Sequence, residues 1–181
     1  MTVKETKFDG VKIITNGVYH DYRGSFQTTY IESEFKDKVG DYNFIQDNES
    51  ISHKGTIRGL HYQKGEFAQA KLVRVIMGSV IDVIVDIRKD SPTFGEYLSI
   101  ILSDDNQKQL MIPRGFAHGF ISLQDNTIFS YKIDNEYNPL AERGIIYNDP
   151  TLNINWDSYY TRSFIISAKD LLLPKFEDII F

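Results

Sequence analysis

Short runs of β-branched and aromatic residues recur through the middle of the chain, and each is followed by residues that favour turns. The turns include Met77-Gly78, Ser103 to Asn106 and Gln124 to Asn126. The predicted strands are Lys71–Ile76, Val80–Asp86, Tyr97–Leu102, Leu110–Ile112, Phe120–Leu123 and Thr127–Ile133. Strands at such regular spacing, separated by turns, are typical of an all-β sandwich or barrel.

Helical patterns are scarce. The best candidate is the short polar segment Glu32–Val39, and the strands leave no room for the crossover helices of about 10–15 residues that a βαβ fold needs. From about Asn148 the pattern changes to an extended or partly helical tail, which we expect to pack on the strands. Internal repeats, low-complexity segments and linkers are lacking, so the sequence predicts one domain over residues 1–181.

Composition narrows the class of protein. The chain has 20 Lys and Arg against 25 Asp and Glu, a net charge of −5, and no run of basic residues, which argues against a nucleic-acid binder. The lack of cysteine excludes disulfides, thiolate nucleophiles, zinc knuckles and iron–sulfur clusters. No stretch approaches the roughly 18 apolar residues that would cross a bilayer, and the first residues do not resemble a signal peptide. A cytoplasmic location is therefore expected.

Two of the four histidines lie in segments that could carry chemistry. His61 follows Arg58 closely, and His118 lies shortly after a Pro-Arg-Gly turn. A lone histidine is more often an ordinary core or surface residue. Here Arg58 and Lys71 accompany the histidines among apolar strands, and a buried cation is costly unless it meets an anion. The sequence thus predicts a pocket for an anionic ligand.

A metal site is a weaker interpretation. Metal-binding cupin barrels carry a His-x-His pair and a Pro-x-Gly-x-x-His segment; only the second is present, ending at His118, and His61 stands alone between Leu60 and Tyr62. Two imidazoles and a lysine fall short of the three protein ligands of a catalytic zinc. Serine-nucleophile, phosphate-loop and dinucleotide motifs are lacking too. General acid–base chemistry remains, with a histidine as base and a tyrosine such as Tyr131 as a candidate acid.

Several segments, in order, resemble one family. They are Asp21–Gly24, Phe44–Asn48, Arg58–Gln63, Lys71–Arg74, Val83–Gly95, Ile112–Phe120, Tyr147–Pro150 and Ser167–Asp170. Together they resemble the RmlC family, the dTDP-4-dehydrorhamnose 3,5-epimerases. The resemblance implies an all-β cupin-type jelly roll with a few short helices, whose C-terminal segment folds back over the pocket. It also implies a homodimer that uses no cofactor.

The resemblance further implies roles for individual residues. His61 matches the family's base, oriented by Asp170, and Tyr131 matches its acid. The matches that surround the sugar and its oxyanion are Arg58, Lys71 and His118, with Lys71 stabilising the enolate. The matches to diphosphate and nucleotide contacts are Arg23 (lent by the neighbouring subunit), Gln46, Asn48, Glu142 and Lys169, with Tyr137 as a further pocket aromatic.

One position departs from the family. Thr28 stands where the family commonly has a glutamate that helps to recognise thymine, and a hydroxyl replaces a carboxylate there only weakly. This predicts weaker thymine binding, with GDP bound at least as tightly as dTDP.

The function that the resemblance implies is inversion of C3, C5 or both in a nucleoside-diphosphate 4-keto-6-deoxy sugar or 4-keto heptose, in deoxysugar, capsule or surface-polysaccharide biosynthesis. Three alternatives remain open at this point. The first is a GDP-4-keto-heptose epimerase or a C3-only or C5-only epimerase. The second is a sugar-nucleotide-binding cupin without catalysis, and the third is a metal-dependent cupin enzyme.

Overall fold

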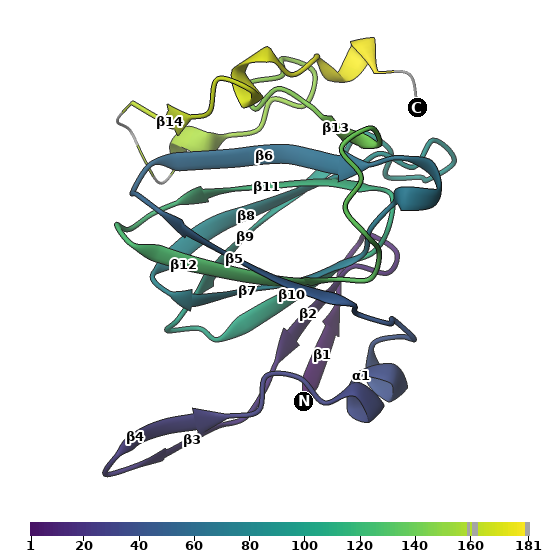
Figure 1. Ribbon diagram of the computed structural model, residues 1–181. Helices are drawn as coiled ribbons and strands as arrows, with labels where there is room; N and C mark the ends of the chain where they lie inside the picture. Colours follow the sequence, from purple (N-terminus) through teal and green to yellow (C-terminus); the bar gives the residue numbers. More distant parts are fainter. Residues whose placement is uncertain (159, 161–162, 180–181) are drawn as a thin grey trace.

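Two six-stranded sheets pack face to face in the computed structural model (Figure 1), which describes residues 1–158, 160 and 163–179. The first sheet is antiparallel, and its strands in spatial order are β1 (Thr2–Glu5), β2 (Lys12–Thr15), β10 (Lys108–Ile112), β7 (Lys71–Met77), β12 (Thr127–Ile133) and β5 (Gln46–Ser52). The second contains β13 (Glu142–Gly144), β6 (Thr56–Gln63), β11 (Phe116–Ser122), β8 (Ser79–Asp86) and β9 (Tyr97–Ser103), and β14 (Ile165–Ile166) pairs with β6 in parallel. The sheets are not closed into one barrel, so the fold is the sandwich form of the expected jelly roll.

The remaining elements are short. A hairpin of β3 (Val18–Asp21) and β4 (Gly24–Gln27) projects away from the sheets at the lower left of Figure 1. The helix α1 (Glu32–Lys38) forms where the polar segment Glu32–Val39 predicted a helix. It lies near the first sheet (Figure 1). Four 3₁₀ turns complete the described elements: η1 (Gly65–Phe67), η2 (Trp156–Ser158), η3 (Asp170–Leu172) and η4 (Phe176–Asp178).

The core between the sheets follows from side-chain alternation along their strands. Val73 and Val75 of β7 and Phe129 of β12 meet Val80 and Ile84 of β8 there. The alternate residues of β8 face the other way and join a second apolar cluster with residues of the C-terminal segment. Because β8 is covered on both faces, its sequence is a nearly continuous apolar run.

The C-terminal segment lies across the outer face of the second sheet, at the top of Figure 1. Trp156 and Phe176 are buried in this layer, and the Trp156 indole N–H donates to the carbonyl oxygen of Tyr147 at 2.7 Å. The pairing of β14 with β6 brings the following residues to the edge of the main cavity. The expectation that this tail folds back over the pocket is confirmed.

The predicted strands agree with the observed ones to within two residues at each end, with one exception. The strand predicted at Phe120–Leu123 begins four residues earlier, at Phe116, because the internal Gly119 does not interrupt the pairing of β11 with β8. The strands before Lys71 were not predicted. Among them, β5 is mostly polar and is defined by its seven-residue ladder with β12.

Two glycines let β6 and β11 approach closely. A Cβ atom on Gly119 would lie 2.7 Å from the carbonyl oxygen of Arg58 and 3.1 Å from the Cα of Gly59. The register between the two strands shifts at this point. Any side chain here must therefore push apart the two strands that carry His61 and His118.

Gly119→Ala is expected to lower the free energy of unfolding by about 1–3 kcal/mol, the usual cost of overpacking a tight contact. Denaturant unfolding measures it. Gly17→Ala is the matched control, because a Cβ there meets Tyr19 only at ordinary contact distance of 3.6 Å. Equal stability of the two variants would contradict the close-approach argument.

Candidate active site

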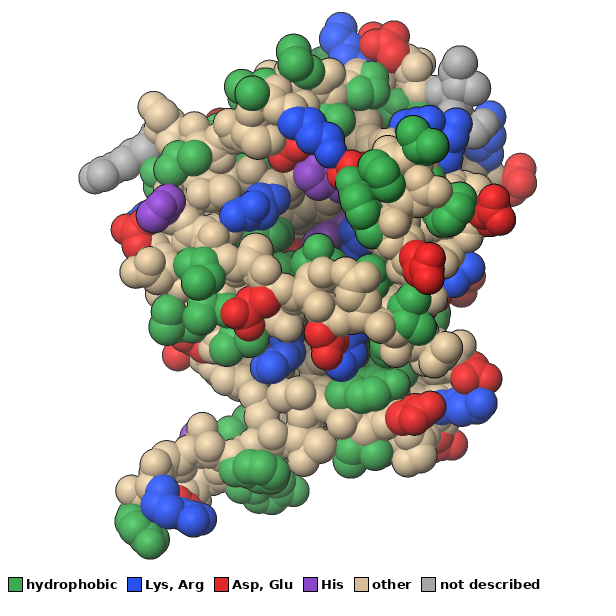
Figure 2. Space-filling model, in the orientation of Figure 1, with side chains coloured by type: hydrophobic (Ala, Val, Ile, Leu, Met, Phe, Trp, Pro, Cys, Tyr) green, Lys and Arg blue, Asp and Glu red, His purple; other side chains and the backbone are tan. Residues whose placement is uncertain are grey.

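The main cavity lies between the two sheets and has a volume of about 670 Å³. In Figure 2 it is a hollow near the middle of the molecule, with histidine and basic side chains on its walls. Both sheets and the C-terminal segment contribute to the lining. The lining side chains that could carry chemistry are Asn48, Arg58, His61, Lys71, His118, Tyr131, Lys169 and Asp170.

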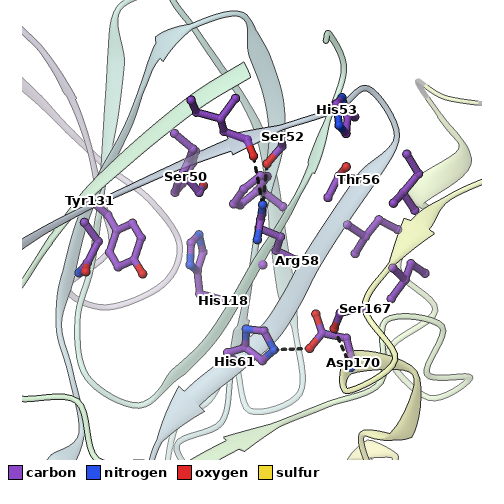
Figure 3. A pocket seen from close by; sticks show the side chains of 18 of the residues that line it. Ser50, Ser52, His53, Thr56, Arg58, His61, His118, Tyr131, Ser167 and Asp170 are labelled. Carbon is purple, nitrogen blue, oxygen red and sulfur yellow. Dashed lines mark hydrogen bonds and ion pairs between the residues drawn. The ribbon is translucent and has the colours of Figure 1, made fainter. Parts of the chain in front are cut away.

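His61 and Asp170 form a hydrogen-bonded pair at one wall of the cavity (Figure 3). The distance from His61 Nε2 to Asp170 Oδ1 is 2.8 Å, and Gly59 N–H donates to the other carboxylate oxygen at 3.3 Å. Burial acts to raise the pKa of Asp170, but the hydrogen bond and charge of His61 outweigh it, so the pKa of Asp170 lies below its usual value. Asp170 therefore remains a carboxylate that orients the imidazole.

Lys71 begins β7 and reaches the same cavity from the first sheet. Burial lowers the pKa of Lys71 to about 8, although the negative charges of Asp82 and Glu142 act to raise it. A lysine with this pKa is still mostly cationic near neutral pH. It is also poorly solvated, so its charge is available to a negatively charged ligand atom.

Tyr131 lies on the neighbouring strand β12, opposite Val73, which is two residues after Lys71 on β7. Burial raises the pKa of Tyr131, and Arg58 opposes the shift only in part, so the phenol keeps its proton near neutral pH. Tyr131 projects from the first sheet and His61 from the second, and both point into the cavity (Figure 3). The arrangement places a proton donor and a proton acceptor on facing walls.

Arg58 bridges the two sheets at the cavity. It lies on β6, and its Nε donates to the hydroxyl of Ser52 at 3.1 Å while its Nη2 donates to the carbonyl oxygen of Ile51 at 3.2 Å. Both acceptors belong to β5 of the opposite sheet (Figure 3). The guanidinium is thus held in place and keeps donors free for an anionic group.

The sequence did not assign a partner to His118. The structure supplies Asp82, whose Oδ1 lies 2.7 Å from His118 Nε2. His118 is buried on β11, directly opposite His61 in the strand register. The only sequence signal for Asp82 was an acid in the middle of the apolar run that forms β8.

A second cavity of about 300 Å³ adjoins the first and shares Asn48, His61, Lys71 and Tyr131 with it. Of the residues expected to contact the diphosphate and nucleotide, Gln46, Asn48, Tyr137 and Glu142 line this second cavity, and Lys169 lines the first. Gln46 donates to Asn48 at 2.7 Å. Another polar part of the wall of the second cavity is a hydrogen-bond network centred on Glu142.

Glu142 Oε2 accepts hydrogen bonds from the Tyr137 hydroxyl at 2.8 Å and from Lys169 at 2.6 Å. Burial acts to raise the pKa of Glu142, but the bonds from Lys169 and Tyr137 more than offset it and hold the pKa below its usual value. The network ties the residue before Asp170 to β13, and so it also supports the His61–Asp170 pair.

Two of the expected substrate-binding residues line neither of these two cavities. Arg23 is exposed at the tip of the projecting hairpin, where it forms an ion pair of 2.6 Å with Asp21. Thr28 is exposed just after β4. Both are therefore separate from the group of expected site residues that the two cavities bring together.

The described residues contain no group of three or more His, Cys, Asp or Glu side chains arranged to hold a metal ion. The expectation of a metal-free reaction stays a prediction. Within the same part of the chain, no helix has the length and apolar character needed to cross a membrane.

This chain is similar over nearly its whole length to one family of sugar-nucleotide epimerases. Residues 5–178 match the family model described as dTDP-4-dehydrorhamnose 3,5-epimerase. A Shigella flexneri enzyme of that name is 45% identical over 98% of this chain and 97% of its own length. The Bacillus anthracis structure, with TDP and PPi bound, is 44% identical with a TM-score of 0.92 and covers 96% of this chain and 98% of the other. The structure of a Legionella pneumophila dTDP-6-deoxy-D-glucose-3,5-epimerase in complex with dTDP-4-keto-L-rhamnose is 41% identical, with a TM-score of 0.94. The match covers 99% of this chain and 94% of the other. The chain belongs to the dTDP-4-dehydrorhamnose 3,5-epimerase family.

Proposed function

We propose that this protein inverts C3 and C5 of a dTDP-linked 4-keto-6-deoxy sugar and is thus an isomerase of deoxysugar biosynthesis. The observation that carries the proposal is the pair of proton-transfer groups on facing walls of one cavity, His61 held by Asp170 and the neutral phenol of Tyr131. A cavity that only bound a sugar nucleotide would not need both groups. This favours the enzyme over a non-catalytic binding protein.

The proposed reaction begins with proton removal next to the ketone. His61 takes the proton from C3 or C5. The electron pair of the broken C–H bond forms a double bond between that carbon and C4, and the π pair of the carbonyl moves onto the 4-oxygen, which becomes an enolate. Lys71 and His118 stabilise this oxygen, the kind of electrostatic effect that usually contributes most to catalysis. Tyr131 then gives its proton to the same carbon from the opposite face, which inverts the centre. Solvent restores the protonation states of His61 and Tyr131.

The charged groups around the cavity suit a diphosphate. We propose that Arg58 and Lys169 neutralise part of its charge and that Gln46 and Asn48 donate to its oxygens. On this proposal the Glu142–Tyr137 pair faces the nucleoside. A diphosphate would compete with Glu142 for Lys169, since both are anionic and the lysine is exposed on one side.

We further propose a homodimer in which the β3–β4 hairpin supplies Arg23 and Thr28 to the neighbouring site. The hairpin projects from the molecule (Figure 1) and carries three exposed aromatic residues, Tyr19, Tyr22 and Phe26, that are 71%, 96% and 67% exposed. Such a cluster of exposed aromatic residues is typical of an interface.

The single domain, the cytoplasmic location and a role in capsule or surface polysaccharide stay predictions.

Two observations point to different bases of the nucleotide. The departure at Thr28 predicts that guanine binds at least as tightly as thymine. The structures of two relatives, 44% and 41% identical, contain TDP and a dTDP-sugar, which supports thymine. We propose thymine, because Thr28 is a single departure on an exposed segment, whereas the similarity to these two relatives extends over 96% and 99% of this chain.

Calorimetric titration is expected to show dTDP binding at least tenfold more tightly than GDP, a difference of about 1.4 kcal/mol. GDP binding as tight as dTDP would support the expectation from Thr28 instead.

The function itself is tested in D₂O with dTDP- and GDP-linked 4-keto-6-deoxy sugars, reading deuterium at C3 and C5 by NMR. Uptake at both carbons with inversion supports a 3,5-epimerase. Uptake at one carbon identifies a C3-only or C5-only enzyme, and binding without uptake would overturn the enzymatic assignment.

A further inference from the structure

A fully buried carboxylate lies in the core next to the catalytic cavity. Asp82 is 0% exposed and sits in the middle of β8, between Val80 and Ile84, whose side chains form the apolar core between the sheets. The alternation along the strand turns Asp82 toward the same side as these two residues. An apolar residue would fill this position at lower cost, because a charge loses its hydration when it is buried.

The contacts of Asp82 are few. Its Oδ1 lies 2.7 Å from His118 Nε2, while its Oδ2 is buried without a hydrogen-bond partner among the described residues. A buried polar atom without a partner costs stability. The one contact that offsets this cost is the contact with His118, so the position has meaning chiefly through that imidazole.

The ring of His118 is fixed from several sides. It stacks on Phe129 with ring centroids 6.0 Å apart, and its Nε2 is directed at Asp82. Its strand position is opposite His61, which has its own carboxylate in Asp170. Two histidine–carboxylate pairs therefore stand next to each other in the second sheet, and both histidines line the main cavity.

We propose that Asp82 is a positioning residue that acts through His118: it accepts the Nε2–H bond and so presents Nδ1 of His118 to the 4-oxygen of the sugar. A carboxylate in this place also stabilises the imidazolium ion, in which Nδ1 carries a proton and donates to the enolate. The proposal rests on the proposed epimerase function. It assigns the two pairs different tasks, proton removal for His61–Asp170 and oxyanion stabilisation for His118–Asp82.

The competing arrangement is a protonated Asp82 that donates to an unprotonated Nε2. In that case His118 would carry its proton on Nδ1 and Asp82 would provide no negative charge. Other charged and titratable groups line the cavity that His118 faces: Glu49 on β5, Arg58 and His61 on β6, Lys71 on β7, Tyr131 on β12, His53, Lys169 and Asp170. Asp82 also interacts electrostatically with the ammonium group of Lys71.

The kinetic test compares three variants: Asp82→Asn, His118→Gln and the double variant. Asp82→Asn keeps the size of the side chain but removes its charge. We expect kcat to fall about 10²- to 10³-fold, the usual loss on removing one oxyanion donor, with a nearly unchanged KM. The double variant should lose no more than His118→Gln alone, because residues that act through one another are not additive. Additive losses would overturn the proposal.

Asp86→Asn is the matched control. Asp86 is as buried as Asp82 and lies on the same strand, but its partners are Arg88, Ser91 and Thr93, and it lines neither of the two cavities. This variant should lose stability while kcat stays close to that of the wild type. An equal fall of kcat in Asp82→Asn and Asp86→Asn would mean that loss of any buried carboxylate of β8 has this effect, and would overturn the proposal.

A measurement on the wild-type protein needs neither substrate nor a folded Asp82 variant. Nitrogen-15 NMR of the histidine rings, with His118 assigned by its loss in His118→Gln, reports which ring nitrogen carries a proton. We expect Nε2 of His118 to be protonated. An unprotonated Nε2 would overturn the proposal even if the epimerase activity is demonstrated, and a protonated Nε2 would support it even if the substrate proves to be different.

Discussion

His61→Asn is expected to abolish deuterium uptake at both C3 and C5 in the folded protein. His61 is the histidine of the cavity that is paired with a carboxylate in the C-terminal segment, at 2.8 Å, and we propose it as the base for both carbons. A positioned general base contributes roughly 10²–10⁴ in rate, so the loss should leave no detectable uptake on the time scale of wild-type exchange. Asparagine keeps a polar side chain of similar size but cannot take the proton.

Binding of dTDP provides the control for this variant. The diphosphate contacts that we propose, Arg58 and Lys169, are unchanged, so the dissociation constant should stay near the wild-type value. A variant that binds dTDP and still exchanges either carbon at the wild-type rate would show that His61 is not the base for that carbon.

Tyr131→Phe is expected to separate proton removal from inversion. The substitution deletes one hydroxyl and leaves the ring, which packs against Phe129 with centroids 6.2 Å apart. Because His61 acts from the other wall, deuterium uptake should continue, while delivery from the opposite face is lost. Inverted product should therefore form about 10²- to 10⁴-fold more slowly.

The measurement follows both processes in one NMR experiment in D₂O, with deuterium uptake in the substrate and appearance of the inverted sugar as separate signals. Inversion at the normal rate would exclude Tyr131 as the acid. Tyr137 would then be the next candidate, and Tyr137→Phe would test it, although its hydroxyl already donates to Glu142.

The sequence supported the roles of His61 and Tyr131 to different degrees. The residue pattern predicted a pocket with cations and a histidine base. It offered Tyr131 only as one candidate acid, and the family resemblance singled it out. In the structure its phenol is half-buried with a raised pKa, which a strand pattern cannot show. Burial of a side chain in a sandwich depends on the facing sheet, and the facing residues are distant in sequence.

The local pattern was sufficient where a strand has its own signals. The strand β12 was predicted with both ends correct at Thr127–Ile133, because turn residues flank a run of strand-forming residues. It was insufficient for β5, which is mostly polar. That strand forms because β12 offers it a complete ladder from Gln46 to Ser52, and such a partner is not visible in the segment itself.

By itself the sequence determined the all-β class, the apolar strands of the core and the group of Arg58, His61, Lys71 and His118 as candidate chemistry, because alternation and turn residues are local properties. Only the tertiary structure decided how the partners meet, although the family resemblance already implied that Asp170 orients His61. Asp170 reaches His61 across 109 residues of chain, and Asp82 meets His118 because β8 and β11 are neighbours in one sheet. It also placed Arg23 and Thr28 away from the two cavities that hold the other expected site residues. The physical reason is that hydrogen bonds and burial act over a few ångströms in space, and the strand pairing that creates those distances is set by the whole fold.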